Sequence, residues 1–226
     1  MQRPILENYE GVTVVRDDLL PGGTKSRFIL PFLKQNEGTE FVYATPPEGG
    51  AQVALAICAY QTGKQATLFV AKRRKRTAYT QKAADYGARI IEISPGWLNV
   101  VQARAQTYAK ERNARLLPFG LNWPEAIKAI SDAAYSINYT PDEVWCAAGS
   151  GVLSQALKKA WPLSDIKTVQ VGKNVENATH IASLRFGQKS KLKPPFPSNP
   201  FYDAKAWDLC QRYKGKGNIL FWNVAG

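Results

Sequence analysis

A lysine at the start of a predicted helix is the first residue whose setting favours chemistry. Lys25 follows Gly22 and Gly23 in a turn between an apolar run and a segment with helical spacing. The glycines let the backbone turn tightly, and the positive end of the helix dipole lowers the pKa of an ammonium group beside it. A lysine with a lowered pKa is the nucleophile that Schiff-base chemistry needs. The alternative is an ordinary turn with a solvated lysine.

A second segment has the composition of a phosphate site. Gly149, Ser150, Gly151 and Val152 follow the apolar run 143–148 and open a predicted helix. Backbone N–H groups at such a strand–helix turn point outward together and bind a phosphate dianion. Because the same pattern occurs wherever a strand packs closely on a helix, it indicates a phosphate site only in combination with other features.

The charge of the chain predicts a polyanionic partner. There are 30 Lys and Arg residues against 18 Asp and Glu, a formal net charge of +12. Basic side chains gain affinity for nucleic acid by displacing counterions from phosphates, although a basic surface that only keeps the protein soluble is the alternative. The candidate nucleic-acid contacts form one consecutive run and one proline-rich segment: Lys72, Arg73, Arg74, Lys75, Arg76, Lys189, Lys191 and Lys193.

Cysteine and histidine usage gives no metal or disulfide pattern. Cys58, Cys146 and Cys210 are widely spaced, and His180 has no ligand or acidic partner at a recognisable spacing. We therefore expect no metal site, no disulfide framework and no histidine catalysis. No signal peptide is predicted, because residues 1–12 contain no apolar core region, and no membrane span is predicted, because no apolar stretch reaches about 18 residues. Together these features favour a cytoplasmic protein.

Predicted strands and helices alternate along the chain, which indicates an α/β fold with parallel or mostly parallel sheets flanked by helices. The apolar, β-rich runs are 11–15, 40–45, 65–71, 88–93, 114–119, 143–148, 166–171 and 218–224. The segments with helical spacing are 24–34, 52–62, 76–86, 95–112, 124–137, 151–160 and 200–214. The Pro- and Lys-rich segment 186–199 is predicted to be a mobile loop. A chain of 226 residues can bury a core as one domain or as two small lobes.

Taken in order, the motifs resemble those of a known enzyme family. They are GGTKSRF at 22–28, GSG at 149–151, NPFYDAKAW at 199–207 and NILFWNVAG at 218–226, with LLPFGLNWPEAIKAISDAA at 116–134 as a further matching piece. This order is similar to that of the tryptophan synthase β-type, or fold type II, pyridoxal-phosphate (PLP) enzymes, in the branch of aminocyclopropane-carboxylate deaminase and D-cysteine desulfhydrase. The resemblance spans nearly the whole chain, which is shorter than a usual member.

The resemblance implies a two-lobed α/β protein with PLP between the lobes. It assigns residues 1–34 and 115–226 to a larger cofactor-binding lobe and residues 35–114 to a smaller, mobile lobe. By the same resemblance, Lys25 would hold PLP as a Schiff base and act in catalysis. Tyr202 would lie near the ring or the reacting carbon, with a buried core tyrosine as the alternative. The implied cofactor-binding residues are Lys25, Gly149, Ser150, Gly151, Val152, Asn223 and Val224. Family members commonly form homodimers, which is an expectation by analogy.

Two departures from the family pattern concern the substrate and the cofactor ring. The loop that grips the substrate carboxylate in the family reads TPPEGGAQ at 45–52. Prolines remove N–H donors and Glu48 adds negative charge, so a free amino acid would be held poorly there. Asn223 and Val224 stand where the family has a His-Thr pair, and Val224 offers the pyridine nitrogen no hydrogen bond. The candidate substrate-binding residues are Thr45, Glu48, Gly49, Gly50 and Gln52.

These features together predict a PLP-dependent lyase that labilises a bond at the α-carbon of an amine, with Lys25 as acid or base. The positive charge and the altered loop favour an amino group tethered to a polyanion: an amino-acid-modified base in DNA, processed by decarboxylation or elimination. One alternative is a small-molecule lyase of the deaminase or desulfhydrase kind. Another is a non-catalytic remnant that binds nucleic acid through its basic face.

Overall fold

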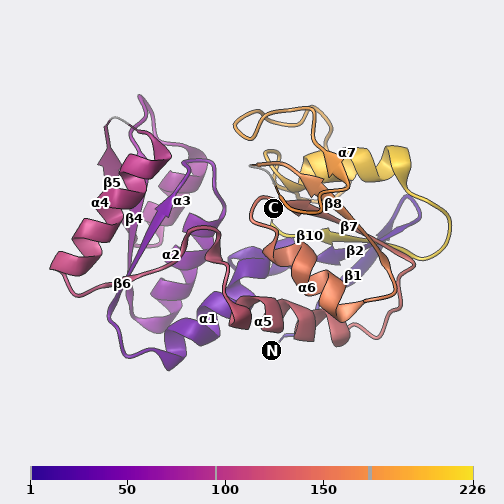
Figure 1. Ribbon diagram of the computed structural model, residues 1–226, viewed down its shortest axis with the longest axis horizontal. Helices are drawn as coiled ribbons and strands as arrows, with labels where there is room; N and C mark the ends of the chain where they lie inside the picture. The colour runs from indigo at the N-terminus through magenta and orange to yellow at the C-terminus, as the bar shows by residue number, and fades with distance from the viewer. Residues whose placement is uncertain (1, 95, 173–174, 226) are drawn as a thin grey trace. The chain divides into compact units, whose positions relative to one another are not determined.

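The computed structural model describes residues 2–94, 96–172 and 175–225, and the chain divides into two compact units. The first unit comprises Met1–Arg27 and Asn122–Gly226, and the second comprises Phe28–Leu121. Each unit contains a sheet of its own with helices packed on it (Figure 1). The second unit is therefore one continuous stretch of chain, whereas the first is assembled from both ends.

The first unit is built on a six-stranded sheet of order β1-β2-β10-β7-β8-β9. Its strands are β1 (Leu6–Tyr9), β2 (Val12–Arg16), β7 (Glu143–Ala148), β8 (Asp165–Gln170), β9 (His180–Ile181) and β10 (Ile219–Asn223). Only the β1–β2 pair is antiparallel. Strands β7 and β10 are buried along their whole length, as expected for apolar central strands that are covered on both faces.

Helices cover both faces of this sheet. Helix α7 (Asp203–Tyr213) lies over one face, and α5 (Pro124–Tyr135) and α6 (Val152–Ala160) lie over the other (Figure 1). The core beneath α7 is aromatic: the ring of Trp207 meets that of Phe221 on β10 at 5.1 Å between centroids. Burial of these large side chains fixes α7, and hence its first residues, against the sheet.

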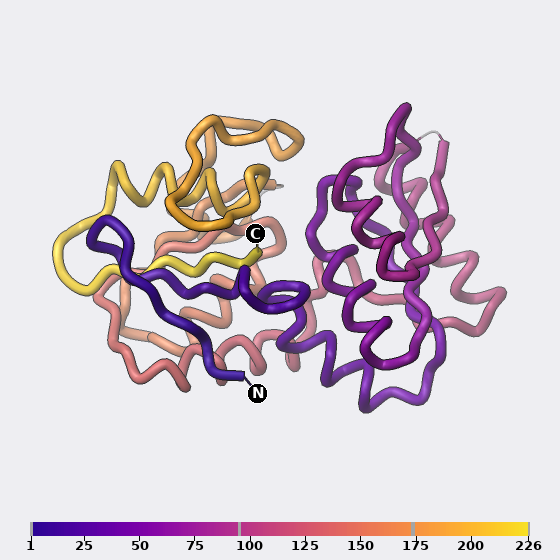
Figure 2. The backbone as a smooth tube through the Cα atoms, turned by 180° about the vertical axis from the view of Figure 1, so that it is seen from behind, coloured from indigo at the N-terminus to yellow at the C-terminus, as the bar shows by residue number. Residues whose placement is uncertain are grey.

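The second unit is a four-stranded parallel sheet of order β5-β4-β3-β6, and Figure 2 traces its alternating strands and helices from behind. Its strands are β3 (Glu40–Thr45), β4 (Gln65–Ala71), β5 (Arg89–Ile93) and β6 (Arg115–Leu116). Its helices are α2 (Ala51–Thr62), α3 (Ala78–Asp85) and α4 (Leu98–Glu111). Helix α1 (Ser26–Gln35) carries the chain from the first unit into the second.

The predicted α/β architecture with mostly parallel sheets is confirmed, with local differences. Strands β1 and β9 were not predicted, because both are short and partly exposed. The run 114–119 yields only the two-residue strand β6, which pairs with β3 at two positions before a 3₁₀ turn begins at Phe119. Segment 186–199 contains neither helix nor strand, and its mobility stays a prediction. Of the predicted segments, Pro95 and Gly226 lie outside the described residues.

Candidate active site

The candidate site lies at the edge of the first unit's sheet where the parallel strands end. Strands β2, β10, β7 and β8 run in the same direction, so their carboxyl ends share one edge. The register aligns Asn223 with Arg16 and, one position earlier, Trp222 with Cys146. The turns that follow β2, β7 and β10 therefore meet at this edge, where α/β proteins bind ligands.

The backbone that carries Lys25 is anchored on the end of β10. Gly23 has φ 67°, a conformation that favours glycine, and a Cβ there would overlap the carbonyl oxygen of Val224. The N–H of Thr24 donates to that same carbonyl at 3.0 Å. Lys25 closes a 3₁₀ turn that leads directly into α1. The predicted turn and helix opening are thus joined to the end of β10 by backbone contacts at Gly23 and Thr24.

A buried ion pair holds this turn from behind. Both guanidinium Nε and Nη2 of Arg27 donate to the carboxylate of Asp17, with Nε 2.8 Å from Oδ2. The hydroxyl of Thr24 donates to the same Oδ2 at 2.8 Å, and the indole N–H of Trp222 reaches the Thr24 hydroxyl at 3.0 Å. Because Asp17 and Arg27 are almost fully buried, the network fixes the positions on either side of Lys25.

The amine of Lys25 lies near enough to a buried carboxyl to interact with it electrostatically. Lys25 keeps part of its surface exposed, but protein atoms surround its amino group, and this burial lowers its pKa while the nearby Asp203 carboxyl opposes the shift. Burial raises the pKa of Asp203 to about 7, against the lowering effect of the Lys25 charge. The sequence predicted a lowered lysine pKa from the helix dipole, whereas in the structure desolvation is the leading cause.

Asp203 is the site residue that the sequence did not reveal. It is 1% exposed, and neither of its carboxyl oxygens completes a hydrogen bond with any described residue. The N–H groups of Val224 and Ala225 approach the carboxyl closely enough to lower its pKa, without reaching full hydrogen-bond geometry. A buried carboxyl without a partner is costly, so its presence beside a lysine indicates a ligand-binding role.

The glycine-rich turn after β7 meets the residue that precedes Asp203. A Cβ on Gly149 would overlap the hydroxyl oxygen of Tyr202, so that hydroxyl lies directly on the Gly149 backbone. Gly151 has φ 80° and caps α6, whose first backbone bond runs from the Gln155 N–H to the Gly151 carbonyl at 3.0 Å. The N–H groups of the preceding turn thus have no acceptor within the helix. Gly149, Tyr202, Asp203 and Lys25 form one continuous set of neighbours.

Asn223 has a structural role at this edge as well as a free acceptor. Its amide nitrogen donates to Asp18 Oδ1 and to the Pro197 carbonyl, both at 2.8 Å. Its Oδ1 is buried and accepts no hydrogen bond from a described residue. The side chain therefore ties the end of β10 to the long loop before α7, and leaves one oxygen for another group.

Known proteins resemble this chain in sequence and in structure. No protein-family model matches the chain. A protein named glycyl-dTMP PLP-dependent decarboxylase, from Pseudomonas phage M6, is 25% identical over 269 aligned residues that cover 97% of each chain. An ACC deaminase homologue of known structure superposes with a TM-score of 0.84, covering 100% of this chain and 90% of that one at 16% identity. The processed form of threonine deaminase isoform 2 from Solanum lycopersicum gives 0.73, covering 99% and 78% at 14% identity.

The chain has the fold of the fold type II PLP-dependent enzymes. The resemblance inferred from the motif order is confirmed by these neighbours. The name of the phage relative also includes PLP. All the predicted cofactor-binding residues belong to the first unit, and the predicted substrate loop belongs to the second.

The predicted substrate loop of the second unit is closed by its own side chains. The amide nitrogen of Gln52 donates to the carbonyls of Pro47 at 2.9 Å and Gly49 at 3.0 Å, and Gln52 is fully buried. A Cβ on Gly49 would lie 2.7 Å from the Thr45 hydroxyl oxygen. Gly50 caps α2. Gln52 therefore shapes the loop, and its buried Oε1 is the atom left without a described donor.

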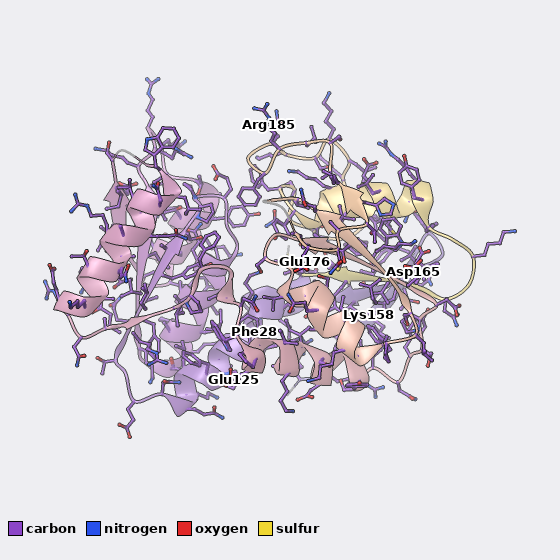
Figure 3. The ribbon with its side chains drawn as sticks, viewed as in Figure 1. Phe28, Glu125, Lys158, Asp165, Glu176 and Arg185 are labelled. Atoms are coloured by element: carbon purple, nitrogen blue, oxygen red, sulfur yellow. The ribbon has the colours of Figure 1, made fainter. Side chains whose placement is uncertain are left out.

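The basic residues belong to different parts of the fold. Lys72 to Arg76 form an exposed loop between β4 and α3 in the second unit. Lys189, Lys191 and Lys193 are exposed in the long loop before α7 in the first unit, from which the side chain of Arg185 also extends (Figure 3). The Lys189 ammonium lies 5.6 Å from the Phe201 ring centroid. The two basic segments are thus separate features of separate units.

The remaining candidate features are the cysteines, a metal site and a membrane span. Cys58, Cys146 and Cys210 are free thiols, and burial raises the pKa of each. Among the described residues, no group of three or more His, Cys, Asp or Glu side chains is arranged to hold a metal ion. Within the same residues, no helix combines the length and the apolar character that crossing a membrane would require.

Proposed function

We propose that this chain is a PLP-dependent enzyme that removes the carboxylate from the α-carbon of an amino acid carried by a DNA base. The observation that carries the proposal is the Lys25 amine, whose pKa is lowered by burial, beside the unpartnered carboxyl of Asp203. A lysine in this state is the nucleophile that binds a carbonyl cofactor. The relative named as a glycyl-dTMP decarboxylase supports the choice of substrate and bond.

The residues at the sheet edge fit PLP. Lys25 would hold its carbonyl carbon, and the turn from Gly149 to Val152 would receive its phosphate, since this turn leads into the N-terminus of α6, where the first N–H groups have no acceptor within the helix. The carboxyl of Asp203 would pair with the protonated ring nitrogen. The family resemblance would place Val224 opposite that nitrogen, where its side chain offers no hydrogen bond, and Asp203 lies close to the Val224 N–H.

When bound, PLP accepts the electron pair that the broken bond leaves on the α-carbon. The chain's own groups supply the rest. Lys25, once released from the cofactor, would return a proton to the α-carbon from its amine. The Asp203 carboxyl, with a pKa of about 7, would stabilise positive charge on its partner at neutral pH. Tyr202, whose hydroxyl lies on Gly149, would limit the space beside the phosphate turn.

A tethered substrate is supported by the shortage of hydrogen-bond donors in the predicted substrate loop of the second unit. The loop 45–52 contains two prolines, and the amide donors of Gln52 are used within the loop itself. A free amino acid would therefore find few donors for its carboxylate. A weakly held carboxylate suits a reaction in which that group leaves, and binding would then depend on the nucleotide to which the amino acid is attached.

A small-molecule deaminase is the second candidate function. Its specific support is that two of the superposed structures are an ACC deaminase homologue and a threonine deaminase. The two functions differ in their products: a decarboxylase releases carbon dioxide and retains the nitrogen, whereas a deaminase releases ammonia and a 2-oxo acid. The non-catalytic alternative predicts neither carbon dioxide nor ammonia as a product.

The first experiment is an absorbance titration of the purified protein with PLP. We expect a shift of the PLP absorbance to longer wavelength that depends on Lys25, because a protonated Schiff base absorbs at longer wavelength than the free aldehyde. Lys25→Ala should remove the shift, and Lys34→Ala, an exposed lysine on the following helix, should leave it unchanged. An equal shift in Lys25→Ala would overturn the assignment of this lysine, and no shift in any variant would support the non-catalytic alternative.

The second experiment identifies the bond. The PLP-loaded protein is incubated with a glycine-bearing thymidine nucleotide and, separately, with free amino acids, and both carbon dioxide and ammonia are measured. We expect carbon dioxide from the nucleotide substrate and little product from free amino acids. Ammonia with a 2-oxo acid from free amino acids would contradict the proposal and establish the deaminase function.

A further inference from the structure

The basic loop of the second unit, residues 72–76, is exposed to solvent at the carboxyl end of β4. Lys72, Arg73, Arg74, Lys75 and Arg76 are all exposed. The loop is fixed at its start, where the Lys72 N–H donates to the Ile93 carbonyl at 2.8 Å. Arg76 pairs with Glu92 at 3.4 Å, and the other four cations form no ion pair with any described residue. Their charges are therefore available to a partner.

An exposed tryptophan lies at the same end of the sheet. Strands β4 and β5 are parallel, and the turn after β5 packs on β4, since a Cβ on Gly96 would lie 2.6 Å from the Ala71 Cβ. Trp97 follows immediately, caps α4 and is 72% exposed. A large indole in water next to a row of cations is the combination that binds single-stranded nucleic acid, by stacking on a base while the cations hold the backbone.

The basic loop also adjoins the predicted substrate loop. The hydroxyl of Thr77, the residue after Arg76, donates to the Pro47 carbonyl at 2.6 Å and accepts the Thr80 N–H at 3.2 Å. Pro47 lies in the middle of the loop 45–52, which follows β3 at the same sheet edge. A ligand bound along residues 72–76 would thus lie beside the segment that is predicted to meet the amino acid.

We propose that the second unit binds its substrate as a single strand of DNA, with phosphates along Lys72–Arg76 and one base stacked on Trp97. This inference rests on the proposed function and specifies the form of its substrate: a polynucleotide rather than a free nucleotide. Five consecutive residues span up to about 17 Å when extended, which exceeds the reach of one phosphate group. The neighbouring base, which carries the amino acid, is then presented beside loop 45–52.

Binding is tested without PLP on the Lys25→Ala protein, so that cofactor chemistry does not enter the measurement. The probe is a fluorescein-labelled oligothymidylate, followed by anisotropy at several salt concentrations. We expect Arg73→Ala/Arg74→Ala/Lys75→Ala to weaken binding by about tenfold or more and to lower the salt slope by about 2. The matched control is Arg104→Ala/Lys110→Ala/Arg115→Ala, which removes the same charge from other exposed positions of the second unit. Equal effects of the two triple variants would overturn the proposal.

Trp97 gives a second, independent readout. Trp97→Ala should weaken binding by about tenfold with the salt slope unchanged, because a stacked indole releases no counterions. Trp97→Phe should retain most of the affinity. Tyr60→Ala is the control, since Tyr60 is 70% exposed on α2 of the same unit. An unchanged affinity in Trp97→Ala would contradict base stacking.

Competition with thymidine 5′-monophosphate separates this inference from the proposed function. We expect the mononucleotide to displace the oligonucleotide only at large excess. If instead the mononucleotide competes equally, and the PLP-loaded enzyme releases carbon dioxide from a modified mononucleotide, the polynucleotide inference fails while the proposed function stands. If the oligonucleotide binds as expected but the PLP absorbance does not shift, the proposed function fails and the binding surface remains.

Discussion

At the scale of single residues, the buried carboxyl of Asp203 governs how the folded chain responds to pH. Its pKa is raised from 3.8 to about 7, chiefly by burial. Between these values the unfolded chain has lost a proton that the folded chain keeps, so the contribution of Asp203 to stability falls as the pH rises from about 4 to about 7 and does not change further above that range. The ammonium of Lys25 moderates the effect, because it favours the charged carboxylate.

Asp203→Asn should remove this dependence. The neutral amide does not ionise, so the variant should gain stability relative to the wild type as the pH rises through the window from about 4 to about 7, by up to about 4 kcal/mol. Urea denaturation at several pH values measures the difference. In a Lys25→Ala background the pKa of Asp203 should rise further, and the window should extend to higher pH. A difference that stays constant across pH would show that Asp203 ionises normally.

The sequence contained Asp203 but no signal that separated it from an ordinary helix-start acid. An aspartate in the first turn of α7 reads as a favourable partner for the helix dipole. Its burial and its missing partner depend on β10 and on Lys25, which are distant in the chain. The signal that was present is positional: it follows Tyr202 inside a motif already matched to the family.

At the scale of elements, the turn after β7 and the start of α7 constrain each other. Gly149→Ala should displace Tyr202, because the added Cβ would occupy the position of its hydroxyl. We expect the variant to bind PLP about tenfold or more weakly, at a cost typical of an overpacked contact. Adding Tyr202→Phe removes the hydroxyl and should restore part of the affinity, measured by the same absorbance titration. Identical affinities in the single and double variants would show that the contact is not limiting.

The buried ion pair behind Lys25 should contribute far more than a surface pair. Asp17→Ala leaves Arg27 buried without its partner and also removes the acceptor of the Thr24 hydroxyl, so it should cost about 3 to 5 kcal/mol of unfolding free energy. Asp132→Ala, which removes an exposed partner of Lys128 on α5, should cost less than about 1 kcal/mol. Chemical denaturation of both variants compares them, and similar losses would contradict the role given to Asp17.

Most helices and strands can be predicted from the sequence because their hydrophobic patterns are continuous. The strands EVWCAA and ILFWN are buried throughout and were recognisable as apolar runs. Strand β9 has two residues and β1 has four, none of them fully buried, so neither carries a pattern, and each exists because a neighbouring strand offers it backbone partners. Apolar sequence alone predicts burial, whereas edge strands depend on pairing that only the folded sheet provides.

At the scale of the whole molecule, the two units differ in how the chain builds them. The second unit is continuous and has its own core, in which Val101, Ala105 and Ala109 of α4 pack against Val42 and Phe69 of the sheet. In the sheet of the first unit, β2, which lies near the N-terminal end of the chain, pairs with β10, which lies near the C-terminal end. Closing that sheet brings together residues far apart in sequence, which carries an entropic cost that the second unit does not bear.

The second unit should therefore fold alone. A fragment of residues 26–121, which keeps α1 complete, should show cooperative thermal unfolding by circular dichroism and slow amide exchange in β3 and β4. The fragment 122–226 should not fold, because without β2 one side of β10 loses its pairing and its buried apolar residues are exposed to water. Mixing 122–226 with a peptide of residues 1–27 should recover structure if the missing strands are the reason. Cooperative folding of 122–226 alone, or disorder in 26–121, would contradict this division of the chain.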